Sequence, residues 1–328
     1  MQAYIRQKYG GPEVLSLGKF HKPSPKPDQL LVKVKAVSVN PLDWHGLRGT
    51  PYLIRLSMGL FKPKNSFLGA DVSGIVEEVG SAITNFKPGD EVYGEINESG
   101  AGSFAEYVCV RQDFWAKKPT NISHEEAAAA PIAALTAIQG LRDHGGLKAG
   151  QKVLINGASG GVGTYAVQIA KAMGAHVTAV CSTHKVDQAN KLGADEVVDY
   201  TKSDLSTLNA KFDLIFDGVG NCEAKIAKRL LKPGGTCLLV GWGGFKHMAK
   251  FALANVLVGK KWNLTFFTAK MNLDDLAYLS ELLSSVKIKS IIDKQFAFEQ
   301  LPQAVAYQED GHASGKVIVT VNQPEHSS

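Results

Sequence analysis

The sequence predicts an α/β protein of two domains, one a barrel-like β domain and the other built on a doubly wound parallel sheet. Its 328 residues are enough for about two domains that each bury a core. The first hundred or so residues read as short strands separated by glycine and proline turns, whereas after Pro119 apolar strands alternate with helices. With 45% hydrophobic and 20% charged residues, the composition is typical of a globular protein.

The predicted β domain is defined by short strands near the N-terminus. Residues 30–39 alternate apolar and polar side chains at their centre, as a half-buried strand does. Further strands are expected at residues 74–79 and 91–93, and Pro88-Gly89-Asp90 forms a turn before the second of them. This pattern favours an all-β, barrel-like arrangement.

The second domain begins with a helix that Ser123 caps and Glu126 completes as a capping-box partner. Helices are also expected at residues 162–173 and 185–192. Apolar strands are expected at residues 152–156, 176–180, 196–200, 212–217 and 236–241. Strand–helix alternation of this kind indicates a parallel, doubly wound sheet. A last strand at residues 315–321 is expected to rejoin the first domain.

Charge and cysteine content restrict the setting of the protein. The net charge of +5 comes from 36 basic and 31 acidic residues without a long basic run, so neither nucleic acid nor membrane binding is indicated. The four cysteines form no CxxC pair, and no signal peptide or membrane-spanning stretch is visible. We therefore expect a reduced, cytoplasmic protein with no integral membrane association.

A glycine-rich turn follows the strand at residues 152–156 and opens an apolar helix. Small residues let a backbone approach a pyrophosphate closely, and a helix N-terminus offers free amides and a positive dipole end. Gly160 is expected to allow the close approach, and Gly163 to let the helix pack on the strand. An ordinary glycine-rich turn is the alternative. The predicted dinucleotide contacts are Ala158, Ser159, Gly160, Gly161, Val162 and Gly163.

The end of the next strand predicts the choice of coenzyme. NAD enzymes place an acidic residue there for the ribose 2′-hydroxyl, but residues 181–185 read Cys-Ser-Thr-His-Lys. Two hydroxyls and a cation suit a 2′-phosphate, and the tyrosine after the third strand could add a hydrogen bond. A solvated helix start is the alternative for the lysine. NADPH is therefore the expected cofactor, held through Ser182, Thr183, Lys185 and Tyr200.

Several landmarks together resemble the medium-chain dehydrogenase/reductase superfamily along nearly the whole chain. They are Val39-Asn40-Pro41-Leu42-Asp43, residues 68–74 (LGADVSG), Pro88-Gly89-Asp90-Glu91-Val92 and residues 158–163 (ASGGVG). The quinone oxidoreductase and ζ-crystallin branch is the most similar, including chloroplast-envelope quinone oxidoreductase homologues. The resemblance implies a GroES-like catalytic domain at 1–122 plus 294–328, and a Rossmann NADPH-binding domain at 123–293.

The resemblance also implies that no metal takes part. Zinc-dependent relatives carry a cysteine and a Gly-His-Glu sequence where this chain has residues 40–43 and Gly69-Ala70-Asp71, so cysteine and histidine ligands are missing there. His45 alone is a surface or pocket residue in this interpretation. Without zinc, an easier electrophile is expected, namely a quinone or an α,β-unsaturated carbonyl compound, whose developing charge hydrogen-bond donors can stabilise.

Three residues of the first domain are candidates for the catalytic site by analogy with the family. Asn40 and Tyr52 are expected as donors near the substrate carbonyl, although Asn40 could instead cap the turn that follows it. Asp43 could fix the loop or join a proton relay. No dedicated proton donor is assigned, because solvent could protonate the product.

Further coenzyme contacts and a homodimer are implied by the same resemblance. The strand at residues 263–268 is where family members pair sheets across a dimer. Residues 247–257 could form an amphipathic helix at a lipophilic pocket or a membrane surface, or an ordinary core or dimer helix. The additional residues expected at the nicotinamide and ribose are Thr136, Val219, Val240, Gly241, Phe266, Phe267 and Thr268.

Two other functions remain open from the sequence. One is reduction of enoyl thioesters or long-chain enones on the same scaffold. The other is a non-catalytic role as a structural or RNA-binding protein that holds NADPH, since fold does not fix function. No aromatic and basic RNA-binding motif is visible, so an enzyme is favoured.

Overall fold

The computed structural model describes residues 1–241 and 263–321, which form two compact units. The first unit comprises Met1–Ile132, Met271–Ser284 and the chain from Ser290, and the second comprises Ala133–Lys270 and Ser285–Lys289. The boundary falls inside helix α4 (Pro131–Ile138). The domain bounds implied by the family resemblance remain a prediction, and the helix expected at residues 247–257 lies outside the described residues.

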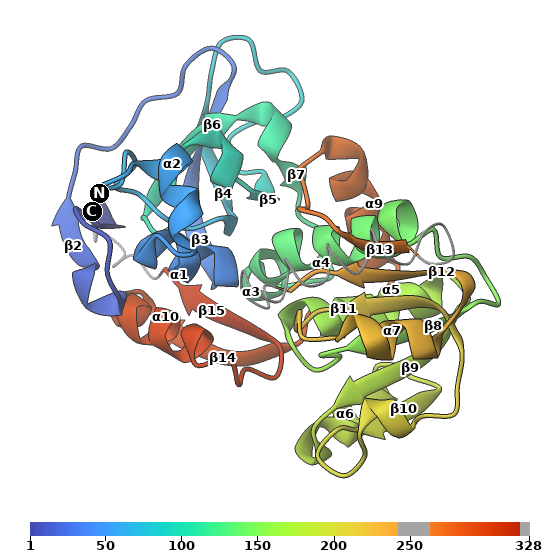
Figure 1. The fold of residues 1–328 in the computed structure, drawn as a ribbon. Coiled ribbons are helices and arrows are strands. Elements are labelled where there is room, and N and C mark those ends of the chain that lie inside the picture. The colour runs from blue at the N-terminus through green and yellow to red at the C-terminus, as the bar shows by residue number, and fades with distance from the viewer. Residues whose placement is uncertain (242–262, 322–328) are drawn as a thin grey trace. The chain divides into compact units, whose positions relative to one another are not determined.

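A seven-stranded sheet forms the core of the first unit (Figure 1). Its strands run in the order β14-β15-β3-β4-β5-β7, and β6 also pairs with β3. A separate antiparallel pair joins β1 and β2. The strands are β1 (Gln2–Ile5), β2 (Ser16–Lys19), β3 (Gln29–Val39), β4 (Asp71–Val79), β5 (Glu91–Glu95), β6 (Tyr107–Arg111), β7 (Ala116–Lys117), β14 (Ile292–Ala297) and β15 (Lys316–Thr320).

Helices and 3-10 turns complete the first unit. Helix α3 begins at the Ser123 cap, and the Ser123–Glu126 capping box is present as predicted. The helices of this unit are α1 (Pro41–Arg48), α2 (Arg55–Met58), α3 (His124–Ala129), α9 (Leu273–Ser284) and α10 (Leu301–Glu309). The 3-10 turns are η1 (Pro12–Val14), η2 (Tyr52–Ile54), η3 (Asn97–Ser99), η4 (Gln112–Phe114) and η9 (Phe298–Gln300).

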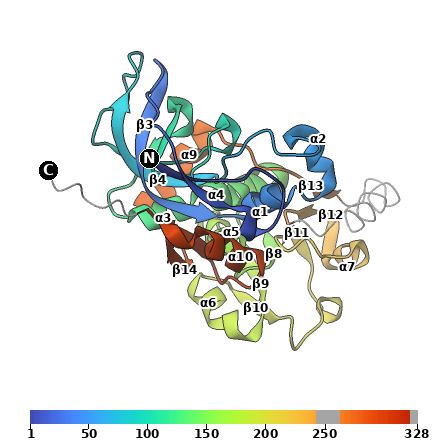
Figure 2. The ribbon, with the colours of Figure 1, turned by 90° about the vertical axis from the view of Figure 1, so that its left-hand side faces the viewer.

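The end of the chain rejoins the first unit, as the sequence predicted. Strand β15 pairs antiparallel with β3, with Val317 opposite Val39 and Val319 opposite Val37. Figure 1 shows the red elements β15 and α10 beside the blue elements β3 and α1, and Figure 2 shows α10 next to α1 from a second direction. Because β15 supplies a central strand, side chains near residue 316 lie next to side chains near residue 40.

A six-stranded, wholly parallel sheet forms the second unit, in the order β10-β9-β8-β11-β12-β13. The strands are β8 (Lys152–Asn156), β9 (His176–Cys181), β10 (Glu196–Asp199), β11 (Phe212–Asp217), β12 (Leu231–Leu239) and β13 (Asn263–Phe266). Between them lie α5 (Gly161–Ala172), η6 (Thr183–Lys185), α6 (Val186–Lys191), η7 (Leu205–Thr207) and α7 (Ala224–Leu230), and η5 (Gln139–His144) continues α4.

This strand order is that of the doubly wound dinucleotide-binding sheet. The order reverses between β8 and β11, and right-handed crossovers then place successive helices on opposite faces of the sheet. On one face, Ala227 and Leu230 of α7 pack with Leu154 and Ile215 of the strands. The doubly wound parallel sheet predicted from the sequence is confirmed, and its reversal point lies at the carboxyl end of β8.

Candidate functional site

The glycine turn after β8 is fixed by backbone hydrogen bonds to the neighbouring strand. The N–H groups of Gly157 and Ala158 donate to the carbonyl of Val180, at 3.2 and 3.0 Å. The N–H of Gly160 donates to the carbonyl of Gly157 at 3.1 Å, and α5 begins at the next residue. The turn therefore joins the end of β8 directly to the N-terminus of α5.

Three glycines of the turn differ in what a side chain at their position would meet. Gly157 has a φ of 80°, a backbone conformation that residues with a side chain rarely adopt. A Cβ on Gly163 would lie 2.0 Å from the carbonyl oxygen of Gly157, so this position must stay bare for the helix to pack on the turn. Among the described residues, a Cβ on Gly160 would meet only that same oxygen, at an ordinary 3.5 Å. The protein itself has no need of a glycine at residue 160, as is expected where a ligand takes up the space.

The start of α5 leaves hydrogen-bond donors for such a ligand. Gly160 is the N-cap and supplies no side-chain cap. The first amides of a helix have no intrahelical acceptor, and within the described chain none accepts from Gly161, Val162 or Gly163. Free amides, a helix dipole and a bare approach suit an anionic pyrophosphate. The predicted dinucleotide residues therefore lie together and fit a dinucleotide coenzyme.

A buried carboxylate orders the next loop of the second unit. Asp217, at the end of β11, is fully buried and accepts from Gly220 N–H at 3.0 Å and from Cys222 N–H at 2.7 Å. The side chain of Asn156 donates to the same carboxylate at 2.7 Å. The loop that carries Val219 is thus tied to the end of β8.

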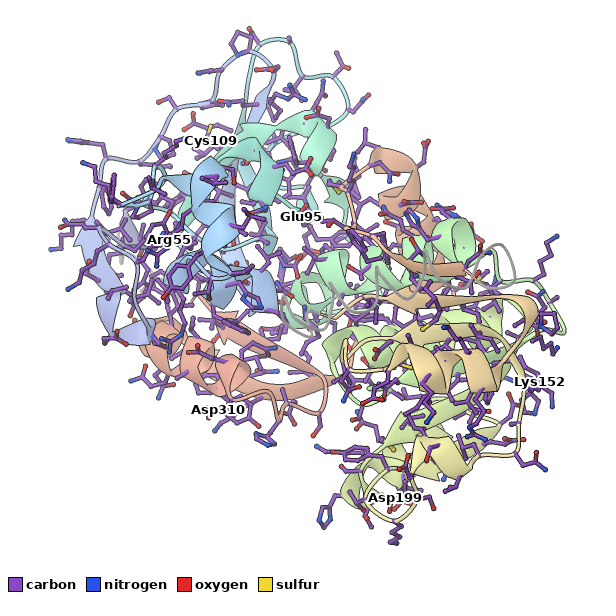
Figure 3. The ribbon with its side chains drawn as sticks, viewed as in Figure 1. Arg55, Glu95, Cys109, Lys152, Asp199 and Asp310 are labelled. Atoms are coloured by element: carbon purple, nitrogen blue, oxygen red, sulfur yellow. The ribbon has the colours of Figure 1, made fainter. Side chains whose placement is uncertain are left out.

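The ends of β9 and β10 hold the residues predicted to select the coenzyme. Lys185 is half-buried and forms no ion pair in the described part of the chain, while Tyr200 is exposed. Thr183 donates to the carboxylate of Asp199 at 2.5 Å, and Thr201 also bonds that carboxylate. These bonds hold the pKa of Asp199 at about 2 (Figure 3). The sequence segment 181–185 lacks an acid, but the fold brings one from the adjacent strand.

The remaining predicted coenzyme residues lie on the second unit with different exposures. Val219 and Phe266 are exposed, and Phe267 stacks on His144 with ring centroids 4.5 Å apart. A Cβ on Gly241 would lie 2.4 Å from the carbonyl of Gly218, so that position is required to be bare. Thr136 and Val240 are half-buried, and Thr268 is exposed.

In the first unit, Asn40 lies in a buried polar cluster. It is the N-cap of α1, and its backbone N–H donates to the Asp43 carboxylate at 2.7 Å. Its Nδ2 donates to Asp71 Oδ2 at 3.0 Å and to the carbonyl of Ser38 at 3.3 Å, while its Oδ1 accepts from Lys316. Asn40 thus caps the helix through its backbone, and its side chain belongs to a network that sequence reasoning did not assign.

Two further carboxyl groups near this network have raised pKa values. Burial raises the pKa of Asp43 to about 7, and the charge of Asp71 adds to the shift. Burial likewise raises the pKa of Glu95, at the end of β5, to about 8 (Figure 3). Asp43 Oδ1 is buried without a partner among the described residues. Lys316 therefore has two buried acids beside it, Asp71 and Asp43, and Glu95 in turn feels the charges of both.

Tyr52 is placed differently from Asn40 and Asp43. It lies on η2 with 72% of its surface exposed, and its ring contacts the guanidinium of Arg55 at 4.7 Å. No hydrogen bond joins it to the buried cluster in the described structure. Its predicted role as a carbonyl donor stays a prediction.

Sequence reasoning missed the residues that organise both regions. Lys316, Glu95 and Asp217 were not singled out, although each is a charged residue at the first or last position of a strand. Asp71 appeared only as part of a motif. Polar residues at strand ends were the available signal, but only the sheet order shows which of them meet.

Two features are absent from the part of the chain that the structure describes. Among residues 1–241 and 263–321, no three or more His, Cys, Asp or Glu side chains are grouped so as to hold a metal ion. In the same residues, no helix combines the length and apolar character needed to cross a bilayer.

Two family models match the chain. One, described as the alcohol dehydrogenase GroES-like domain, matches residues 26–120, and the other, described as zinc-binding dehydrogenase, matches residues 192–319. Among solved structures, the quinone oxidoreductase from Coxiella burnetii is 30% identical with a TM-score of 0.86, and covers 98% of this chain and 99% of its own. An NAD-dependent alcohol dehydrogenase is 29% identical with a TM-score of 0.85, covering 98% and 100%.

Curated relatives align with almost the entire chain. The bovine mitochondrial NAD(P)H oxidoreductase RTN4IP1 is 36% identical over 98% of this chain and 89% of its own length. The tomato (Solanum lycopersicum) 2-methylene-furan-3-one reductase is 36% identical, and the chloroplastic NADPH-dependent alkenal/one oxidoreductase of Arabidopsis thaliana is 34% identical, each over 97% of this chain and 79% of the relative. Because these relatives include organellar proteins, the cytoplasmic location stays a prediction.

Proposed function

The chain belongs to the medium-chain dehydrogenase/reductase superfamily, among the quinone oxidoreductase and alkenal/one reductase homologues, and from this membership we propose that it reduces a quinone or an α,β-unsaturated carbonyl compound with NADPH and without a metal ion. It is an oxidoreductase that uses a nicotinamide coenzyme. The choice of NADPH, the acceptor and the absence of metal are the proposed parts.

The bare backbone at Gly160 is the observation that carries the proposal. Within residues 1–241 and 263–321, no atom lies closer than 3.5 Å to a Cβ at this position, and the neighbouring helix amides lack acceptors. Residues 158–163 would hold the pyrophosphate through these amides. When bound, the coenzyme supplies the hydride.

NADPH is proposed over NADH because of the groups at the end of β9. Lys185, which forms no ion pair in the described chain, can meet a 2′-phosphate, and Ser182 and Tyr200 can donate hydrogen bonds to it. The Arabidopsis relative is named as NADPH-dependent, which supports this choice. Asp199 accepts a hydrogen bond from Thr183, and its negative carboxylate would repel a 2′-phosphate. We propose that the attraction between Lys185 and the 2′-phosphate outweighs this repulsion.

The substrate oxygen would be stabilised by hydrogen bonds from the first unit. Hydride addition to a quinone or enone leaves negative charge on oxygen, as a hydroquinone anion or an enolate. The Nδ2 bond of Asn40 to Ser38, at 3.3 Å, is longer than its bond to Asp71 and is the one that substrate could replace. Asp43 would fix this end of α1 through its bond to the Asn40 amide.

A metal ion is not needed to balance the negative charge of Asp71. Asp71 is already paired with the ammonium of Lys316, at 3.4 Å. Cysteine and histidine, the ligands that zinc prefers in this family, are absent from residues 40–43 and 69–71. We therefore propose a metal-independent reaction.

A homodimer is proposed through β13. This strand lies at one edge of the six-stranded sheet, and its Phe266 is 60% exposed. By the family resemblance, this strand is where two copies pair their sheets, and the exposed phenylalanine is an apolar surface that a second copy can cover. Light scattering of the purified protein tests this part, and a monomer at micromolar concentration would contradict it.

The proposed activity is tested by loss of NADPH absorbance with three acceptors: a benzoquinone, an alkenone and an enoyl thioester. Turnover with the first or the second, unchanged after treatment with a metal chelator, is expected. Turnover with the thioester alone would favour the alternative substrate class. Tight NADPH binding with no turnover would favour a non-catalytic protein, and loss of activity on chelation that zinc restores would refute the metal-independent mechanism.

A further inference from the structure

Lys316 is a buried cation at the centre of the first unit's polar cluster. It opens β15, next to β3, and is 3% exposed. Its ammonium donates to Asn40 Oδ1 and, at 3.4 Å, to Asp71 Oδ2. A buried lysine is rare unless it is paired, because removing its charge from water is costly. Its position therefore calls for an explanation beyond packing.

The contact with Lys316 determines how the Asn40 side chain is oriented. An amide has an acceptor end and a donor end, and only the acceptor Oδ1 can face an ammonium. The donor Nδ2 must then face Asp71, at 3.0 Å, and the Ser38 carbonyl, at 3.3 Å. A flipped amide would place N–H groups against the cation and an oxygen against the carboxylate, so both contacts would become repulsive.

Asp71 completes this arrangement. Its Oδ2 accepts from Ser38, Asn40 and Lys316, and its Oδ1 accepts from Ile132 N–H, at the start of α4, at 3.0 Å. Each oxygen of the Asp71 carboxylate thus accepts at least one hydrogen bond. These bonds hold the carboxylate next to Asn40 Nδ2, the donor end of that amide.

We propose that Lys316 is a positioning residue for the reduction, which holds the Asn40 amide with its donor end available to the substrate oxygen. This inference rests on the proposed function, in which Asn40 donates to that oxygen. A substrate carbonyl would then meet an N–H group, whereas a flipped amide would present it with a second oxygen.

A purely structural role for Lys316, as the counter-ion of Asp71, must be distinguished from positioning. Lys316→Met alone leaves a buried carboxylate unpaired and is expected to lower the melting temperature. The double variant Lys316→Met with Asp71→Asn removes both charges, so its melting temperature is expected to return close to that of the wild type. The two roles differ in what this double variant does to turnover.

The test measures the melting temperature, the KM for NADPH and kcat with the best quinone or enone. For the double variant we expect a fold close to wild-type stability and an unchanged KM for NADPH, with kcat reduced about 100-fold, as for the loss of one oxyanion donor. Lys294→Met, at an exposed position of the neighbouring strand β14, removes the same charge and is expected to leave KM and kcat unchanged. Because its ammonium lies over the rings of Phe296 and Tyr307, a small fall in its melting temperature is expected.

A double variant with wild-type kcat would overturn the inference, since Lys316 would then be a counter-ion only. A reduced kcat in the Lys294→Met control would also overturn it, because net charge rather than position would matter. Failure of the wild-type protein to reduce any acceptor is a separate result, which refutes the proposed function.

Discussion

The glycine turn of the second unit and the polar cluster of the first unit accommodate charged groups in opposite ways. The turn removes side chains, so that backbone amides of Gly161 and its neighbours are left without acceptors in the described chain. The cluster instead assembles charged side chains, and its Asp71 and Lys316 are paired before any ligand arrives.

The difference shows which sites tolerate water and which do not. Amides at a helix start can be solvated until an anion replaces the water, so they need no internal partner. A buried carboxylate or ammonium without a partner costs several kcal/mol, so the cluster must be internally balanced in the free protein. The turn is therefore sensitive to added volume, and the cluster to lost charge.

The largest expected effect is on coenzyme binding at Gly160. Gly160→Val adds volume where, of the atoms that the structure describes, only the Gly157 oxygen lies within 4 Å of a Cβ. The chain should therefore fold normally while the pyrophosphate is excluded. We expect the Kd for NADPH to rise at least about 100-fold, with an unchanged melting temperature. Fluorescence titration of NADPH and a thermal melt check this. Normal affinity would place the pyrophosphate elsewhere.

Three residues further on, Gly163→Ala should act through stability instead. Its Cβ would lie 2.0 Å from a backbone oxygen, which cannot move without disturbing the turn. We expect the free energy of unfolding to fall by about 2 kcal/mol or more, as overpacking does. Urea denaturation measures it, with Gly160→Ala as the matched control. Equal stability of the two variants would mean that the turn adapts and that the contrast is wrong.

The cluster is best probed through pH at Asp43. Its pKa is about 7 in the folded protein, above the usual value of about 3.9 for an unfolded chain. The folded state therefore binds more protons between these values, and stability falls as pH rises from about 4 to about 7. Asp43 faces Asp71 on β4 and Lys316 on β15, and its charge also reaches Glu95 on β5.

Asp43→Asn removes this dependence and retains an oxygen for the Asn40 amide. Between pH 5 and pH 8 we expect the variant to gain about 2 kcal/mol of unfolding free energy relative to wild type. Urea denaturation at the two pH values measures the gain, and Asp28→Asn, an exposed acid, serves as the control. If the difference in unfolding free energy between variant and wild type is the same at both pH values, then folding does not raise the pKa of Asp43.

The smallest effect, on coenzyme affinity, is expected at Lys185, because this side chain is only half-buried and water screens its charge. Lys185→Ala should raise the KM for NADPH about tenfold and leave that for NADH nearly unchanged, because only NADPH carries the 2′-phosphate. Lys191→Ala, an exposed lysine on α6, is the control. Equal changes for both coenzymes would remove Lys185 from the phosphate site.

Much of the second unit could be read from sequence because its signals are local. The glycine turn, its strand and its helix follow one another within about twenty residues, so residue type and spacing suffice to predict them. The acid at Asp199 escaped this reasoning, because it reaches Thr183 from a neighbouring strand, 16 residues further along the chain.

The sequence by itself determined the two-domain architecture, the glycine turn between strand and helix, the Ser123 cap and the return of the last strand to the first unit. Only the tertiary structure decided that Lys316 meets Asn40 and Asp71, which lie 276 and 245 residues away from it. It also decided that Asp43 and Glu95 are buried. The physical reason is that a pKa and a buried ion pair depend on which groups burial brings together, and this is set by the order of strands in the sheet, not by spacing along the chain.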